Sequence, residues 1–415
     1  QSEGTLSIAY TVSEIGLRHT TAGVNTSNYT NDLNWQGLTL TAINGDGDTN
    51  VDDPLAFGTL IRDGSSGVKG NIVFKGASGA DSILLTRENS YAGKTWLTKD
   101  VHVVFGSDSG FGTTEALRVD TGSSVNFAGF NQTMGALFAL GSDALKGAGN
   151  LTVNGVAVIE GANADLSADW TFNNEVTIKD AFALGKGSVA LAGTTSKLTV
   201  NGVQGDIVNA ITGGAGTSLV LTNGDNVNTN VNFTTKDILG GTAFTGSVDI
   251  ASGTSAGFTL TSGTAIGNEL DVAAGGTLRI SSVNGGNLSF ANTETNISGT
   301  LDITNVTLNA AANKDRFTNA SLSAHTGAEF EVTEVIGEGV FKDLSFTDGS
   351  TIKFANGTPG EYGDNAARID LGDEGTLSFA ETVNIELDLD DYVNASEVSE
   401  IQTGLQNKRL TAQDL

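Results

Sequence analysis

Carboxylate and amide side chains alternate near the start of the chain, in the stretch AINGDGDTNVDD. Oxygen ligands at this spacing are typical of an EF-type calcium loop. The fit is incomplete, because Ala42 stands at the first ligand position and Asp53 is shorter than the usual Glu. The stretch therefore predicts either a calcium site or a polar surface loop. The candidate ligands are Asn44, Asp46, Asp48, Asn50 and Asp53.

Three stretches have the residue types of hydrolase active-site loops: VDTGSS at Asp120, DSG at Asp108, and SGTSAG further along. An aspartic protease needs two such acidic loops from separate lobes, and Asp108 is too close in sequence to Asp120 for that. A serine nucleophile needs a histidine oriented by a carboxylate, and His19, His102 and His325 lie in no recognisable histidine motif. We therefore expect no enzymatic activity.

The charge balance limits the kinds of partner. A formal net charge of −27 repels nucleic acid and anionic membranes at long range and favours cations or basic protein patches. An anionic glycan would need local positive charge, for which the candidates are Lys94, Lys99, Arg279 and Lys353. The absence of Cys from 415 residues is consistent with export through an oxidising compartment.

A row of acidic side chains is predicted near the end of the chain. In ETVNIELDLDDYV, apolar residues alternate with Glu386, Asp388 and Asp390, so one strand would present carboxylates to solvent. The row has two interpretations: the charges protect a sheet edge from pairing with other chains, or they form an acidic docking strip.

The elements that position these residues are short strands separated by turns. In GGTLRISS, Leu278 and Ile280 lie on one face and Arg279 and Ser281 on the other; SGTLDITN and GSTIKFAN alternate in the same way. NGG, TNG and TDG segments separate the strands, because Gly and Asn accept the positive φ of tight corners. Such short strands must stack on one another to bury their apolar face.

The strands recur at intervals close to one coil of a solenoid. A Gly followed by Thr, Ser or Ala opens strands at Gly253, Gly276 and Gly299, at equal separations of about 23 residues. The longer interval of about 37 residues from Gly216 to Gly253 indicates a coil with an inserted loop. We therefore predict an all-β fold, a right-handed parallel β-helix; a tandem array of β-sandwiches is the alternative.

The pattern divides the chain into three parts. Residues 1–45 are predicted to form an N-terminal cap or irregular first coils, and residues 46–391 the β-helix. Residues 392–415 are polar and are predicted to form a short amphipathic helix or a linker towards a missing translocator. The chain begins without a charged and apolar leader, as expected of a mature exported protein.

Two segments resemble the repeat of bacterial autotransporter passenger domains, in particular the AIDA-type adhesins. The first, ENSYAGKT, matches an Asn-Thr-Tyr-Thr-Gly-x-Thr pattern, and the second runs from Leu117 to Leu137. The matching residues are Asn89, Ser90, Tyr91, Ala92, Gly93 and Thr95 in the first, and Gly122, Phe127, Gly129, Gln132, Thr133 and Gly135 in the second.

The resemblance implies a secreted passenger displayed on a Gram-negative cell, whose membrane attachment would be a C-terminal translocator barrel that this sequence lacks. Such proteins commonly act as adhesins. We therefore expect binding along the face of the β-helix to a host extracellular-matrix protein such as fibronectin, or to host glycans including glycosaminoglycans. Self-association that promotes bacterial aggregation and biofilm is one alternative, and a β-helical glycan-cleaving enzyme is another. Neither nucleic-acid binding nor a cofactor other than calcium is expected.

Overall fold

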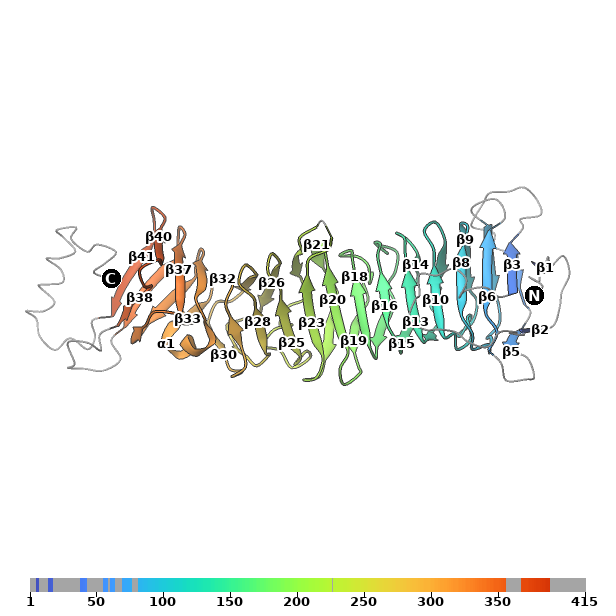
Figure 1. The fold of residues 1–415 in the computed structure, drawn as a ribbon, viewed down its shortest axis with the longest axis horizontal. Coiled ribbons are helices and arrows are strands. Elements are labelled where there is room, and N and C mark those ends of the chain that lie inside the picture. Colours follow the sequence, from blue (N-terminus) through green and yellow to red (C-terminus); the bar gives the residue numbers. More distant parts are fainter. Residues whose placement is uncertain are drawn as a thin grey trace, which may run out of the picture. The chain divides into compact units, whose positions relative to one another are not determined.

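The computed structural model describes residues 5–6, 14–17, 38–42, 55–58, 60–63, 69–76, 81–225, 227–355 and 367–388. These residues form short strands that pair in parallel with strands one coil away in sequence, so the chain winds as a β-solenoid (Figure 1). The prediction of an all-β parallel β-helix is confirmed. The chain divides into two compact units, Gln1–Thr217 and Ser218–Leu415.

Unit 1 contains three sheets that run along the stack of coils, together with a short additional strand pair. In each sheet a strand pairs with the equivalent strand of the next coil. The first sheet contains β1 (Thr5–Leu6), β3 (Leu38–Ala42), β6 (Ile72–Gly76), β8 (Thr95–Thr98), β10 (Ala116–Val119), β13 (Ala136–Ala139), β16 (Ala157–Ile159), β18 (Glu175–Ile178) and β20 (Lys197–Asn201). The second contains β4 (Leu55–Phe57), β7 (Asp81–Leu85), β9 (Val101–Phe105), β11 (Ser124–Asn126) and β14 (Leu145–Lys146). The third contains β12 (Gln132–Met134), β15 (Asn150–Val153), β17 (Asp169–Phe172), β19 (Val189–Leu191) and β22 (Ile211–Gly213). β2 (Glu14–Leu17) pairs with β5 (Leu60–Asp63), and β21 spans Gln204–Ile207.

Unit 2 has the same organisation. One sheet contains β23 (Ser218–Thr222), β25 (Ser247–Ile250), β28 (Leu270–Val272) and β31 (Asn296–Ile297). A second, called here the β24–β40 sheet, contains β24 (Asn230–Phe233), β26 (Ser255–Leu260), β29 (Thr277–Ser282), β32 (Thr300–Thr304), β34 (Ala320–Ala324), β37 (Phe341–Phe346) and β40 (Thr376–Phe379). A third contains β27 (Ala265–Ile266), β30 (Asn287–Phe290), β33 (Thr307–Asn309), β35 (Glu329–Val332), β38 (Thr351–Ala355) and β41 (Asn384–Asp388), and β36 (Val335–Ile336) pairs with β39 (Arg368–Ile369).

The predicted alternation of faces is confirmed. In β29, Leu278 and Ile280 are buried, whereas Arg279 and Ser281 are half-buried on the outer face. β32 and β38 repeat this pattern. Each strand therefore gives its apolar side chains to the interior of the coil and its polar side chains to the outer surface.

The predicted coil length is confirmed where successive strands of one sheet are compared. Ser255 pairs with Thr277 and Thr277 with Thr300, so each step is about 23 residues. The interpretation of the Gly216–Gly253 interval as one coil is wrong, because Gly216 precedes β23 and Gly253 precedes β26, which belong to different sheets. The register of Leu219 with Val248 gives a coil of about 29 residues there.

Some of the aromatic rings in the interior stack from coil to coil. The rings of Phe233 and Phe258 are stacked with centroids 4.8 Å apart, close to the distance between paired strands. In unit 1, the Phe105 ring contacts Phe111 and Phe127 edge to face. Equivalent core positions in adjacent coils therefore pack directly on one another.

Buried asparagine side chains join consecutive coils at the corners. The Asn163 side chain is fully buried; its Oδ1 accepts from the Leu145 N–H (2.9 Å), and its Nδ2 donates to the Ala183 carbonyl (2.7 Å). Asn268 forms comparable bonds in unit 2. These amides satisfy backbone groups that turn away from the sheets.

The first autotransporter-like segment has a structural role in the interior. Asn89 accepts from the Ile61 N–H and donates to the Gly110 carbonyl, so it spans three coils. The buried Tyr91 hydroxyl hydrogen-bonds with the Thr95 hydroxyl (2.7 Å), and burial raises the Tyr91 pKa well above its usual range. A Cβ at Gly93 would overlap the Gly70 carbonyl group, so glycine is required there.

The second segment forms corners. Gly122 and Gly129 have φ of +87° and +94°, which glycine adopts without strain. The Gln132 side chain is buried, accepts from the Phe111 N–H and donates to the Gly112 carbonyl. The residues that resemble the passenger repeat therefore stabilise coils and corners.

One short helix interrupts the strands of unit 2. α1 (Ala310–Asn313) begins where the Asn309 side chain accepts from the Ala312 N–H, and a 3₁₀ turn (Lys314–Arg316) follows it. No helix in the described part of the chain is both long and apolar enough to cross a membrane. Of the predicted cap at 1–45, only β1, β2 and β3 are described, and they pair in parallel with other strands of unit 1; the segment 392–415 lies outside the described residues.

Candidate functional site

Two of the predicted cationic ligand residues lie in unit 1, and only one of them is exposed. Lys99 is exposed in the turn after β8, at φ +56°. Lys94 is only 5% exposed, so little of its side chain is available to a ligand at the surface, and its ligand-binding role stays a prediction. Lys94 directly precedes β8, a strand in the middle of its sheet; its backbone N–H donates to Asn71 Oδ1, and its carbonyl accepts from the Ile72 N–H.

The predicted residues near the end of the chain gather on a different sheet. Lys353 in β38 forms an ion pair with Glu331 of β35 (3.3 Å), and its register partner in β41 is Glu386. Lys353 is thus flanked by carboxylates rather than available to an anionic ligand. Asp388 pairs in register with Ala355, its side chain is not described, and Asp390 lies outside the described residues.

The predicted calcium loop, with Asn44, Asp46, Asp48, Asn50 and Asp53, also lies outside the described residues. Among the residues that the structure does describe, no group of three or more His, Asp or Glu side chains is placed to hold a metal ion. Calcium binding at this loop therefore stays a prediction.

The hydrolase-like stretches have structural contacts. Asp120 accepts from the Arg118 Nε (2.7 Å) and the Trp96 Nε1 (2.8 Å). Asp108 accepts from the Asn131 N–H in the next coil. These carboxylates hold side chains and corners in place.

His102 and Ser124 form a pair that sequence reasoning missed. They are register partners on β9 and β11, with Nδ1 and Oγ 2.8 Å apart. Ser124 is only 6% exposed, so its hydroxyl has little access to a substrate.

The outer face of the β24–β40 sheet carries small polar side chains in register. One row contains Ser255, Thr277, Thr300 and Ser321; a second contains Gly257, Arg279, Asp302 and Ser323; a third contains Thr259, Ser281 and Thr304. Neighbours within a row are separated by the strand spacing of about 4.8 Å. The result is a face of repeated hydroxyl groups that also carries Arg279 and Asp302 and, next to Ser321 in the first row, Asp343.

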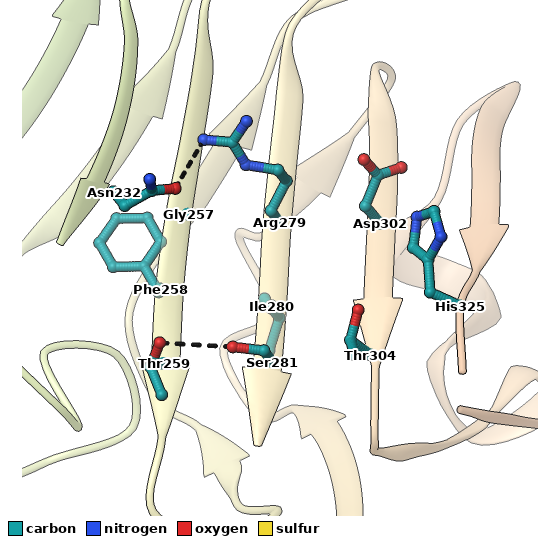
Figure 2. A pocket seen from close by; sticks show the side chains of 10 residues that line it. All are labelled: Asn232, Gly257, Phe258, Thr259, Arg279, Ile280, Ser281, Asp302, Thr304 and His325. Atoms are coloured by element: carbon teal, nitrogen blue, oxygen red, sulfur yellow. Dashed lines mark hydrogen bonds between the residues drawn. The ribbon is translucent and has the colours of Figure 1, made fainter. Parts of the chain in front are cut away.

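A groove of about 300 Å³ opens on this face (Figure 2). Its walls and floor come from β24, β26, β29 and β32, with one residue after β34. The lining residues are Asn232, Gly257, Phe258, Thr259, Arg279, Ile280, Ser281, Asp302, Thr304 and His325. Of the residues predicted from sequence to bind a ligand, Arg279 lies in this groove.

Arg279 is held by the neighbouring coils. Its Nη1 donates to Asn230 Oδ1 (2.9 Å), and its Nη2 donates to the Val231 carbonyl (2.9 Å) and to Asn232 Oδ1 (3.0 Å). To reach β24 the guanidinium crosses β26 over Gly257, where a Cβ would lie 2.6 Å from Asn232 Oδ1 and 3.3 Å from the Arg279 Nε. Glycine thus leaves the space in which the guanidinium lies.

Asp302 is the register partner of Arg279 on β32, yet Arg279 turns away from it toward Asn232 (Figure 2). No ion pair of the described residues includes Asp302. Burial raises the pKa of the Asp302 carboxyl, while the nearby His325, Ser323 and Arg279 partly oppose that rise. Figure 2 places the His325 ring beside Asp302.

Asp302, His325 and Asn232 were not among the residues predicted from sequence. The signal that points to Asp302 is the coil register, because steps of about 23 residues align Gly257, Arg279 and Asp302. The position of the Arg279 side chain depends on Asn230, two coils earlier in the chain, and no local pattern contains that information.

Comparison with family models, with curated proteins and with solved structures found no match to this chain.

Proposed function

We propose that this chain is a surface-displayed adhesin of the autotransporter-passenger type, which binds a linear host glycan along the outer face of the β24–β40 sheet. The export and cell-surface localisation rest on the passenger-like segments and the absence of Cys. The observation that carries the binding function is the groove with its registered hydroxyl rows, because an extended polymer meets the same groups at each coil.

Two observations favour a glycan over a peptide strand from a matrix protein. β26, β29 and β32 are each paired with a strand on both sides, so none offers a free edge for an added strand. Recognition on this face must therefore use side chains, and Ser and Thr hydroxyls both donate to and accept from sugar hydroxyls.

The groove supports binding better than cleavage. Glycoside hydrolysis generally uses two carboxyl groups on opposite sides of the scissile bond. Asp302 is the sole carboxylate among the residues that line this groove. Weak contacts repeated along a polymer give useful total affinity without any reaction.

The test is binding of the chain to immobilised extracellular matrix before and after periodate treatment, which destroys the vicinal diols of sugars and leaves most protein epitopes intact. Thr304→Trp fills the groove from an outward, half-buried position. The matched control is Thr307→Trp, which adds the same bulk at a half-buried position of a different sheet in unit 2.

We expect Thr304→Trp and periodate each to reduce binding at least about tenfold, while Thr307→Trp binds like the original chain. Binding that survives both treatments would favour a protein ligand. Concentration-dependent sedimentation without any matrix binding would favour bacterial aggregation by self-association instead.

A further inference from the structure

The groove contains one positive and one negative side chain, and their contacts indicate which glycans suit it. The inference that follows rests on the glycan-binding function proposed above and concerns the charge of the ligand. It depends on how Arg279 and Asp302 are already engaged.

Arg279 has limited capacity for an anion. A guanidinium has five N–H donors, and three bonds to Asn230, Val231 and Asn232 occupy both groups of its forked end. An incoming carboxylate or sulfate that needs bidentate pairing would have to break these bonds. The remaining N–H groups suit single hydrogen bonds to neutral oxygen atoms.

Asp302 accepts a hydrogen bond from Ser323, and its carboxylate has acceptor sites for further donors. An ionised carboxylate only accepts hydrogen bonds, and burial already disfavours its charge, as its raised pKa indicates. Sugar hydroxyls would supply donors to it without adding charge. A sulfate or uronate would instead lie within a few ångströms of a like charge in a partly desolvated groove.

The side chains around Arg279 and Asp302 also suit a neutral glycan better than an anionic one. Ser281 and Thr304 offer hydroxyls in the third row, next to Arg279 and Asp302 of the second row, and the Thr259 and Ser281 hydroxyls lie 3.3 Å apart. Arg279 and Asp302 cancel in formal charge, so the groove does not offset the −27 charge of the chain, which repels polyanions at long range. The volume of about 300 Å³ is at the small end of ligand pockets.

We propose that the groove binds a neutral, hydroxyl-rich glycan, with Asp302 accepting from sugar hydroxyls and Arg279 donating to a sugar oxygen, and that it discriminates against sulfated and uronate-containing chains. This excludes glycosaminoglycans as ligands of this groove.

The direction in which one substitution changes the affinity for neutral and anionic glycans tests the proposal. Asp302→Asn keeps the shape of the side chain and removes its charge. It should therefore lower the affinity for a neutral glycan that donates to the carboxylate and raise the affinity for an anionic glycan that the carboxylate repels. Asp271→Asn is the matched control, because it changes the net charge equally from an exposed position on β28, in a different sheet of unit 2.

The probes are neutral hexasaccharides (chitohexaose, cellohexaose, maltohexaose and an N-acetyllactosamine trimer) and anionic ones (heparin, chondroitin sulfate and hyaluronan hexasaccharides), measured by calorimetry or on a glycan array. We expect at least one neutral probe to bind and Asp302→Asn to weaken it about tenfold, since hydrogen bonds to a charged acceptor are about twice as strong as neutral ones. Asp271→Asn should leave that affinity unchanged.

The other outcomes are distinct. An anionic probe that binds more tightly to the original chain than any neutral probe would overturn this inference and leave the adhesin proposal standing. A neutral probe whose affinity neither Asp302→Asn nor Thr304→Trp changes would place the site elsewhere and also overturn it. If the original chain binds no probe and no periodate-sensitive matrix, the proposed function itself fails.

Discussion

Replacing the buried Asn163 tests how strongly consecutive coils depend on each other. Its side chain accepts from the Leu145 N–H in the preceding coil and donates to the Ala183 carbonyl in the following one. Asn163→Ala removes both partners at a site with 0% exposure. A buried backbone group left without a partner costs about 1–3 kcal/mol, so the two groups together predict a loss of about 2–6 kcal/mol.

Hydrogen exchange followed by mass spectrometry is the assay, because it reports local opening free energies along the whole chain. In a solenoid each coil contacts only its neighbours, so the faster exchange should centre on peptides that contain Leu145 and Ala183. Asn173→Ala is the control, because the Asn173 side-chain amide donates to Asn154 Oδ1 at the surface (2.7 Å). We expect the local opening free energy to change by no more than about 0.5 kcal/mol in this variant. A loss below about 0.5 kcal/mol for Asn163→Ala, or a uniform change over the entire chain, would refute the reasoning.

Three further predictions concern packing and pH. Gly93→Ala should lower the thermal midpoint by several degrees, since its Cβ would overlap the Gly70 carbonyl group, whereas Gly214→Ala, with no atom within 4 Å of its Cβ, should be tolerated; equal midpoints would contradict this. Ser188 donates its hydroxyl and backbone N–H to Asp169 and lowers the Asp169 pKa, so that contribution is present above the unfolded pKa and is lost as pH falls through the folded value. Ser188→Ala should therefore destabilise the chain more in urea titrations at pH ~6 than at pH ~2, and an equal effect at both pH values would argue against the assignment. Burial raises the Asp302 pKa, so its ionisation lowers stability as pH rises from the unfolded value of 3.8 through the higher folded one. Asp302→Asn should lose less stability over that interval than the original chain, and parallel pH profiles in the same titrations would contradict the cause given.

The fold class could be predicted from the sequence because the solenoid repeats its pattern locally. Alternation around Leu278 and Ile280 indicates which side chains are buried, and the spacing of Gly276 and Gly299 gives the coil length. The same rule failed at Gly216, because glycine turns precede strands of more than one sheet, and turn chemistry does not identify the sheet that follows.

The candidate site was less predictable, for reasons visible in individual residues. Lysine side chains are usually exposed, but Lys94 is only 5% exposed. Arg279 was predicted as a candidate to contact an anionic glycan, and the structure shows it hydrogen-bonded to Asn230, Val231 and Asn232, because the absence of a side chain at Gly257 opens the path between them. Such contacts join residues two coils apart, and only the register brings them together.

The most direct test of glycan binding on this face is a crystal structure of the chain with the neutral hexasaccharide that binds most tightly. We expect sugar density in the groove of the β24–β40 sheet, with a hydroxyl within hydrogen-bonding distance of Asp302 and an oxygen atom near Arg279. Density for the sugar on another face, such as beside Lys353 or Lys99, with this groove unoccupied, would contradict the proposed binding site.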